Sequence, residues 1–170
     1  MRLYSGKVGS IAKDIVRTLL ASEAIEAEDP REVERDIESV MTSYLQVERD
    51  VNDKTRELLQ RTGRGQNEFS RVRAQIAESH GIKVGDEMLD YLLDQVVEML
   101  MHSQNVDEVY CEDVELRRAM RPAFRSHLAA DAELDAEVRA QLKHVKEGTH
   151  MWDIEYARAL ETVKRRKGLG

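Results

Sequence analysis

Residues 29–60 form one long stretch with helical apolar spacing, and this stretch limits the fold more than any other feature. Asp29 is a suitable N-cap, Pro30 suits the first helical position, and Glu32 completes a capping-box pattern. Apolar residues then recur at alternating spacings of three and four: Val33, Ile37, Val40, Tyr44, Val47, Val51 and Leu58. A helix of this length spans about 48 Å and cannot bury such a stripe alone. The stretch therefore predicts an assembly of helices.

The composition also favours an all-α fold. The 170 residues are 41% hydrophobic and 35% charged but only 5% aromatic, which disfavours a β-sandwich or barrel. The net charge of −7 argues against nucleic-acid binding over the whole surface, but it is compatible with a local basic patch. The single cysteine, Cys111, excludes an intrachain disulfide. Because there is neither an apolar leader nor a membrane-length apolar run, we expect a cytoplasmic protein without a membrane contact.

Each of the helices expected in the first half of the chain recurs in the second half. Shorter helices are expected over residues 5–23 and 67–80, on either side of the long one. The pattern then starts again, with a short helix over 85–104, a long helix over 113–143 and a terminal helix over 151–167. The order and relative lengths of the helices are therefore the same in both halves.

The recurrence indicates an internal duplication. A shift of 83 residues places Ile37 on Met120, Met41 on Phe124 and Leu45 on Leu128, although Ala123, His127 and Ala130 replace larger residues of the first seam. The sequence predicts two tandem copies of a three-helix unit, residues 1–83 and 84–170. A unit of about 80 residues is marginally stable alone, so we expect the two repeats to pack together as one structural unit.

The second long helix contains a proline that the first lacks. Pro122 falls at the position of Ser39. A proline inside a helix removes one backbone hydrogen bond and clashes with the preceding turn. We therefore expect a kink or a break in the second long helix near Met120 to Pro122.

Several short segments together resemble a known family. They are the opening Met1–Val8, the pairs Ile15-Val16 and Leu19-Leu20, the acidic connector to Asp29-Pro30, and the closing Val163–Leu169. In combination they are similar to the domain-of-unknown-function 507 family of bacterial proteins, over nearly the whole chain if both copies are counted. The resemblance implies a small all-helical bacterial protein. It implies no activity, so no functional residue is carried over from it.

Candidate metal ligands and nucleophiles do not converge in the sequence. Pairs with ligand-like helical spacing occur singly, and they are Glu147 with His150, His127 with Asp131, and Glu98 with His102. Cys111 stands beside Glu112 and Asp113, whose negative charges oppose formation of a thiolate. We expect no catalytic residue, no metal site and no cofactor, and therefore no enzyme.

Two segments are basic although the chain as a whole is acidic, namely residues 56–73 and 158–167. Their candidate phosphate-contacting residues are Arg61, Arg64, Arg71, Arg73, Lys164, Arg165, Arg166 and Lys167. The same cations also have a purely structural explanation, because positive charge in a last helical turn stabilises the helix dipole. Both explanations remain open from the sequence.

These features together predict a non-enzymatic helical module for protein–protein interaction or scaffolding. Its partner would be another protein or a second copy of the chain, through contact between acidic and basic faces. The alternative is a nucleic-acid- or ribosome-associated factor that uses the basic segments 56–73 and 158–167.

Overall fold

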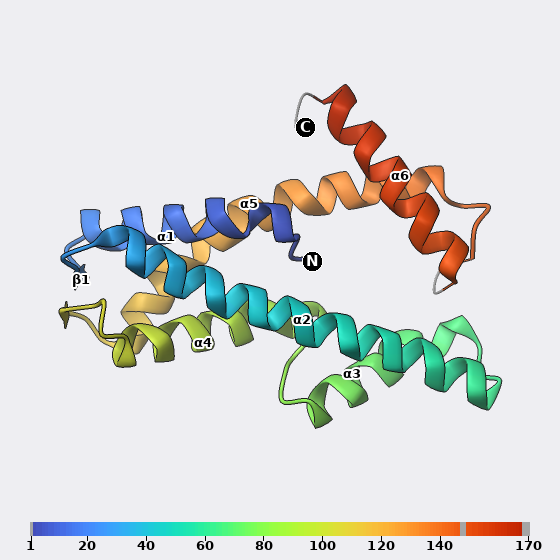
Figure 1. Cartoon of the computed structure of the whole chain (residues 1–170), viewed down its shortest axis with the longest axis horizontal. Helices are drawn as coiled ribbons and strands as arrows, with labels where there is room; N and C mark the ends of the chain where they lie inside the picture. Colours follow the sequence, from blue (N-terminus) through green and yellow to red (C-terminus); the bar gives the residue numbers. More distant parts are fainter. Residues whose placement is uncertain (1, 147–148, 168–170) are drawn as a thin grey trace.

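The computed structural model describes residues 2–146 and 149–167, except for the side chains of 129–132, and it has an elongated, all-α architecture (Figure 1). The six α-helices of these residues are α1 (Val8–Ala21), α2 (Pro30–Thr62), α3 (Phe69–Ser79), α4 (Met88–His102), α5 (Asp113–Gln141) and α6 (His150–Arg166). Short 3-10 turns lead into α1, α3 and α4. The predicted all-α class is confirmed.

Helix α2 begins and ends close to the residues expected from the sequence. The Asp29 side chain caps it by accepting a hydrogen bond from the Arg31 backbone N–H at 3.0 Å. Glu32 forms an ion pair with Arg35 at 2.6 Å, on the exposed side of the first turn. After Thr62 the chain leaves the helix through Gly63, whose φ of 67° is a left-handed conformation that glycine adopts without strain.

The buried stripe of α2 is shifted from the predicted seam in its second half. Its fully buried positions are Val33, Ile37, Met41, Tyr44, Glu48, Val51, Thr55 and Leu59, whereas Val40 and Val47 are only half-buried. These positions are more often four residues apart than three, as a straight helix of 3.6 residues per turn requires. The expected seam followed a 3.5-residue repeat too strictly, and it therefore missed the buried polar residues.

Two short strands lie in the connectors, where no strand was predicted. β1 (Ile25–Glu26) and β2 (Glu108–Val109) pair antiparallel, with Ile25 opposite Val109 and Glu26 opposite Glu108. Each strand has only two residues, and each finds its partner in the other half of the chain. The pair joins the two helical connectors at one end of the molecule (Figure 1).

One hydrophobic core is built from both halves of the chain. α1 packs on α2 as α4 packs on α5, and the halves are joined by α1 against α5 and α2 against α4. The largest fully buried side chains of this core include Ile11, Ile37, Met41, Leu92 and Phe124. α3 then packs on the far end of α2, and α6 packs on the far end of α5 (Figure 1). The molecule is thus a four-helix body with two helical arms.

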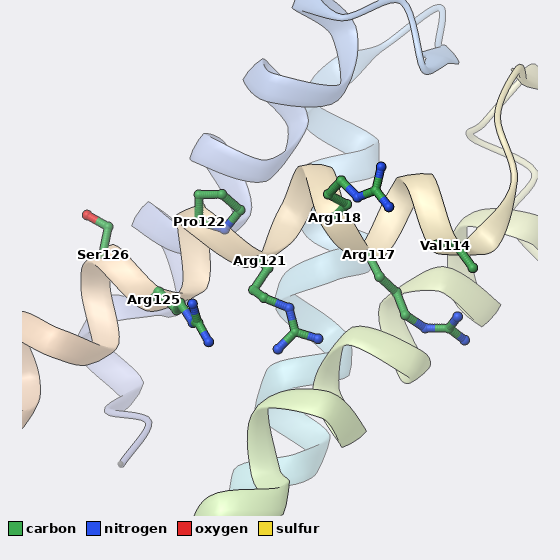
Figure 2. Close-up of a pocket in the computed structure, with 7 residues that line it drawn as sticks. All are labelled: Val114, Arg117, Arg118, Arg121, Pro122, Arg125 and Ser126. Carbon is green, nitrogen blue, oxygen red and sulfur yellow. The ribbon is translucent and has the colours of Figure 1, made fainter.

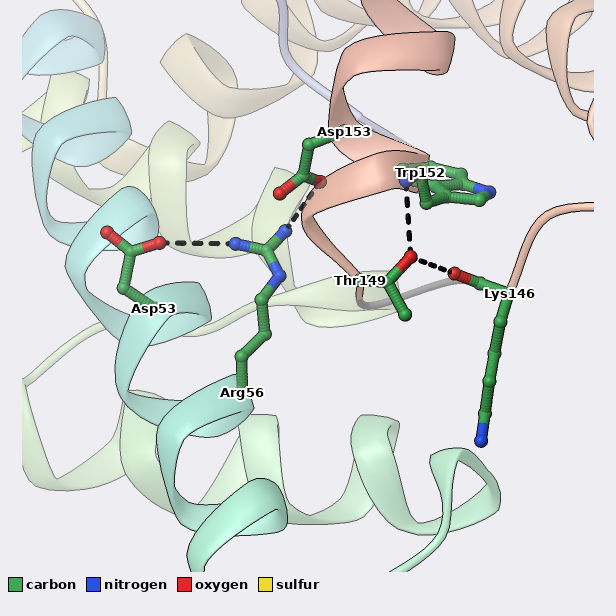
Figure 3. A network of polar contacts seen from close by, with 6 residues as sticks. All are labelled: Asp53, Arg56, Lys146, Thr149, Trp152 and Asp153. Carbon is green, nitrogen blue, oxygen red and sulfur yellow. Dashed lines mark hydrogen bonds and ion pairs between the residues drawn. The ribbon is translucent and has the colours of Figure 1, made fainter.

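The arm formed by α5 and α6 has a small core of its own. Its buried residues are Leu134, Val138, Leu142, Trp152, Tyr156 and Val163. Thr149 caps α6 by accepting a hydrogen bond from the Trp152 N–H at 3.1 Å, and its hydroxyl donates to the Lys146 carbonyl at 2.7 Å (Figure 3). The N-cap therefore fixes the start of α6 beside the aromatic residue that fills the small core.

Polar contacts on two sides hold the α5–α6 arm to the rest of the molecule. Arg56 of α2 lies 3.1 Å from Asp53 and 3.2 Å from Asp153 of α6, so one guanidinium bridges the two arms (Figure 3). On the other side, the Tyr4 hydroxyl lies 2.7 Å from that of Tyr156. The N-terminal segment is thereby tied to α6.

Helix α5 continues through Pro122 without a break. The proline is exposed, so its ring does not disturb the core. The helix loses only the hydrogen bond that residue 122 would have donated to the Arg118 carbonyl. Of the expected kink or break, a break is therefore wrong, and the kink stays a prediction. The start of α5 is fixed by a capping box, in which the side chains of Glu112 and Glu115 accept from each other's backbone N–H groups.

Candidate functional site

Most of the predicted phosphate-contacting residues already have carboxylate partners. On α3 and the segment before it, Arg64 lies 4.0 Å from Glu68, and Arg71 pairs with the same carboxylate. On α6, Arg165 pairs with Glu161 at 2.6 Å. Each carboxylate offsets one positive charge, so Arg165 is balanced, whereas Arg64 and Arg71 share Glu68 and keep one positive charge between them.

The end of α6 is paired in the same way. Arg166 and Lys167 both contact the Glu137 carboxylate of α5, the lysine at 2.8 Å. Within residues 2–146 and 149–167, only Arg61 and Lys164 of the eight predicted residues have no ion pair. The two basic segments also lie on different arms, one against α2 and the other against α5 (Figure 1). The fold does not combine them into one basic surface.

Arg73 is a residue of α3, and its side chain takes part in the contact between α3 and α2. Its guanidinium lies 3.3 Å from Glu48, and both side chains are largely buried, with 24% and 11% of their surfaces exposed. The Tyr44 hydroxyl lies 3.2 Å from the same carboxylate and 3.0 Å from the Lys83 carbonyl, so its single proton can be donated to either. Burial, and next the charge of Glu48, raise the pKa of Tyr44, which stays neutral. This cluster attaches α3 to α2.

A different basic surface lies on the first half of α5, and we call it the arginine face. Its residues line a concavity of about 760 Å³, and they are Val114, Arg117, Arg118, Arg121, Pro122, Arg125 and Ser126. Figure 2 shows all seven side chains on successive turns of the one helix. Residues three and four apart lie on one side of a helix, so this spacing gathers the four guanidinium groups along α5.

The four arginines differ in how they are held. Arg117 lies 2.6 Å from Asp94 of α4, and Arg121 lies 2.7 Å from Asp90, one helical turn away. Arg118 and Arg125 are exposed and form no ion pair with any residue in the described ranges. The two paired arginines are thus fixed against α4, and the other two supply positive charge that nothing in the described structure balances.

Apolar groups accompany the arginines. Val114 is 59% exposed, and the exposed ring of Pro122 lies two turns further along the same helix. Arginine is among the residue types enriched at protein–protein interfaces. The arginine face therefore combines charge with apolar contact area.

The surroundings of this face are acidic. Helix α4 and the turn before it contain five carboxylates and neither lysine nor arginine, and the carboxylates are Asp86, Glu87, Asp90, Asp94 and Glu98. In the strand pair beyond, Glu26 stands directly opposite Glu108. The arginine face is therefore a positive island of limited length, bounded by negative charge.

The sequence contained a signal for this face that our predictions did not use. Arg117, Arg121 and Arg125 follow one another at intervals of four, with Arg118 beside them. On a helix that spacing places cations on one side. The predictions rested on helix ends and on the apolar seam, and this outer side of the second long helix belongs to neither.

The remaining predicted groups are dispersed. His127 lies 2.6 Å from Asp14 of α1, and the hydrogen bond to His127 lowers the pKa of that aspartate. His102 approaches the Glu98 carbonyl at 2.8 Å, which is a local helical contact. Burial, and then the charge of Glu115, raise the pKa of the Cys111 thiol. Among the described residues, no group of three or more His, Cys, Asp or Glu could hold a metal ion.

Some of the sequence predictions fall outside the described residues. Glu147, the Asp131 side chain and Gly168 are in this group. For the helices that are described, none combines the length and apolar character needed to cross a membrane.

Comparison with known proteins identifies the family. No curated protein matches the sequence. The model of a family described as "Protein of unknown function (DUF507)" matches residues 1–169 in one span, which includes both halves and the arginine face. The chain therefore belongs to the DUF507 family.

Proposed function

We propose that this protein is a non-enzymatic interaction module and that the arginine face of α5 is its contact surface for a protein. The observation that carries the proposal is the row of four arginines along α5, which lines a concavity together with the exposed Val114 and Pro122. A cytoplasmic location in a bacterium, where Cys111 stays reduced, remains part of the proposal.

The chemistry of the face favours carboxylates on the partner. A guanidinium group presents a planar fork of N–H donors that matches a carboxylate in bidentate geometry. Each exposed ion pair contributes at most about 1 kcal/mol, so charge alone gives modest affinity. Contact with Val114 and Pro122 adds the apolar area that such an interface needs.

We further infer that the chain arose as two tandem copies, residues 1–83 and 84–170, within one DUF507 unit. The helix pairing supports this inference, because exchanging α1, α2 and α3 with α4, α5 and α6 reproduces the same set of contacts. The strand pairing is also unchanged when residues 83 apart are exchanged, since Ile25 opposite Val109 becomes Glu108 opposite Glu26. The two halves are then related by an approximate two-fold axis through the strands.

This symmetry makes the arginine face a specific feature of the second copy. Under the shift of 83 residues, Arg117 and Arg121 correspond to Glu34 and Glu38 of α2. The related face of the first copy therefore has glutamates in place of two of the four arginines, whereas Arg118 corresponds to Arg35 and Arg125 to Thr42. We infer that the second half alone acquired the binding surface, whereas both halves kept the buried residues of the shared hydrophobic core.

The alternative function is association with nucleic acid or the ribosome. The unpaired Arg118 and Arg125 favour it to a degree, because exposed arginines also bind phosphate. The acidic boundaries on α4 and the strand pair disfavour it, since a continuing phosphate backbone would approach them. Treatment of isolated complexes with nuclease separates the two functions: a protein partner stays bound, whereas a partner held through RNA is released.

The test is a native purification from cells that compares two charge-matched double variants. Arg118→Ala/Arg125→Ala removes the unpaired cations of the arginine face. Arg61→Ala/Lys164→Ala removes two cations that likewise form no ion pair with described residues, but on the arms. We expect the first variant to lose at least about 90% of a nuclease-resistant protein partner and the control to keep it, as quantified by mass spectrometry. Equal retention by both variants would contradict the proposal.

A further inference from the structure

We propose that the protein bound at the arginine face is a second copy of this chain, through an antiparallel contact between the first halves of two α5 helices. The inference rests on the proposed function, because it names the partner of the same face. It follows from the order of charges along α5 and from the acidic surroundings of the face.

The first half of α5 has a self-complementary charge order. Glu112, Asp113 and Glu115 stand at its start and are all exposed, and the four arginines follow from Arg117 to Arg125. When two such helices cross antiparallel, the acidic start of each lies beside the basic stretch of the other. A two-fold contact repeats every such pair, so each favourable contact occurs twice. This arrangement needs no other partner.

The apolar groups of the face fit the same contact. Val114 and Pro122 lie four residues on either side of Arg118. In an antiparallel contact centred near Arg118, Val114 of one copy therefore lies beside Pro122 of the second. Arg125 then lies near the Glu112 and Asp113 end of the other helix. In the same register Arg121 lies near Glu115 of the second copy, while the two Arg118 side chains meet at the two-fold axis. Each copy thus contributes two acid–base contacts and the apolar pair, against one like-charge contact at the axis.

The surroundings favour a short acidic partner over a long polyanion. The acidic side chains at the start of α5 extend over about one helical turn, and the arginines from Arg117 to Arg125 extend over about two and a half, so both charged stretches are short. A nucleic-acid strand that left the face along α4 would approach Asp90, Asp94 and Glu98. A second copy presents the carboxylates at the start of its own α5 to the arginines.

The experiment measures the mass of the full-length chain in solution by sedimentation equilibrium, from about 1 to 100 µM. We expect a dimer at about 0.05 M salt that weakens at about 0.5 M, because exposed ion pairs are screened. A monomer throughout this range would overturn the inference. A measured molar mass that stays the same at both salt concentrations and in the variants below would also overturn the inference.

Two charge-reversed copies test the register. The acidified copy has Arg118→Glu/Arg125→Glu, and the basified copy has Asp113→Lys/Glu115→Lys. Each alone should dimerise at least about tenfold more weakly than the natural chain, since like charges then face each other. A mixture of the two should form a heterodimer, because both ends again have opposite charges. Absence of the heterodimer, with both copies folded by circular dichroism, would overturn the inference.

A second basified variant keeps the test valid if the first basified variant is destabilised. Glu115 takes part in the capping box of α5, whereas Asp113 does not. If the double variant melts well below the natural chain, Asp113→Lys alone replaces it in the mixture. The cation-removing variants described above separate this inference from the proposed function. Loss of a different protein on removal of Arg118 and Arg125, together with a monomeric natural chain, supports the function and overturns the dimer.

Discussion

Helices α2 and α5 occupy corresponding positions in the two halves, yet their outer sides differ. Where α2 has Glu34 and Glu38, α5 has Arg117 and Arg121, and α5 also carries Pro122 in place of a serine. The inner sides of the two helices remain alike, with Ile37 and Met120 among the fully buried residues. The comparison indicates that the core positions fix the fold, and that the outer side of one helix is free to carry the binding surface that we propose.

The two arms show a second difference. The α2–α3 arm is held by a polar cluster in which Glu48, Tyr44 and Arg73 meet beneath α3. The α5–α6 arm is held by an apolar core that includes Trp152, whose ring stacks on Tyr156 with centroids 4.8 Å apart. The two corresponding arms are therefore stabilised by different interactions, polar contacts in one and apolar packing in the other. Different substitutions should therefore destabilise each arm.

The largest expected effect is loss of folding when the shared inner side is charged. Ile37→Asp places a carboxylate at a fully buried position, which should cost more than about 4 kcal/mol of unfolding free energy. Met120→Asp on α5 should be as severe, because both positions belong to one core. Ser39→Asp, on the exposed side of α2, is the matched control and should change stability by less than about 0.5 kcal/mol. Urea unfolding measures all three, and folding retained by both buried variants would contradict the assignment of the core.

A smaller effect is expected at the polar attachment of α3. Glu48→Ala leaves the largely buried Arg73 without its carboxylate and should cost about 1–3 kcal/mol. Glu68→Ala is the control, since it removes a carboxylate that also pairs with arginines but at a more exposed site, and it should cost less than about 1 kcal/mol. Hydrogen exchange should show faster opening of α3 in Glu48→Ala, with α6 unchanged. Equal loosening of both arms would show that they are not independent.

The smallest effect is expected at the other arm, on acidification. Burial by itself would raise the pKa of Asp135, but hydrogen bonds from Tyr156, Arg139 and Tyr4 outweigh it, and the pKa is lowered. A carboxyl with a lowered folded pKa contributes stability above its unfolded pKa, near 4, and this stability is lost as the pH falls through the folded pKa. The attachment of α6 should therefore weaken below about pH 4, by less than about 1 kcal/mol.

Asp135→Asn is the control for this pH dependence, because it cannot titrate. Thermal unfolding of the natural chain and of Asp135→Asn should differ most at neutral pH and converge as the pH falls below about 4. A difference that stays constant with pH would mean that the charge of Asp135 does not contribute. Trp152 fluorescence follows the arm directly, since this tryptophan is the only one in the chain.

Local signals in the sequence located the helices well. Asp29 and Pro30 marked the start of α2, and the glycine after Thr62 marked its end, because caps act through the residues next to them. The strands Ile25–Glu26 and Glu108–Val109 could not be predicted in the same way. Each strand consists of two residues, and its partner strand lies more than 80 positions away, so no local sequence pattern predicts it.

The candidate site was harder to predict for a related reason. Ion pairing depends on which acidic residues the fold brings near, and in the structure six of the eight predicted cations contact carboxylates. Arg118 and Arg125 stand out only once the structure shows that α4 provides carboxylates for their neighbours and none for them. Likewise, Glu48 is spaced like a core residue, but its burial is explained only by Arg73 on α3.

The most direct test of the arginine face is chemical modification of arginines in the native complex, followed by mass spectrometry. Reaction with phenylglyoxal compares Arg118 and Arg125 with Arg61, which is also exposed and also unpaired among the described residues. We expect Arg118 and Arg125 to be protected at least about fivefold in the complex relative to the dissociated chain, with Arg61 unchanged. Equal modification of all three in both states would contradict the conclusion that α5 carries the binding surface.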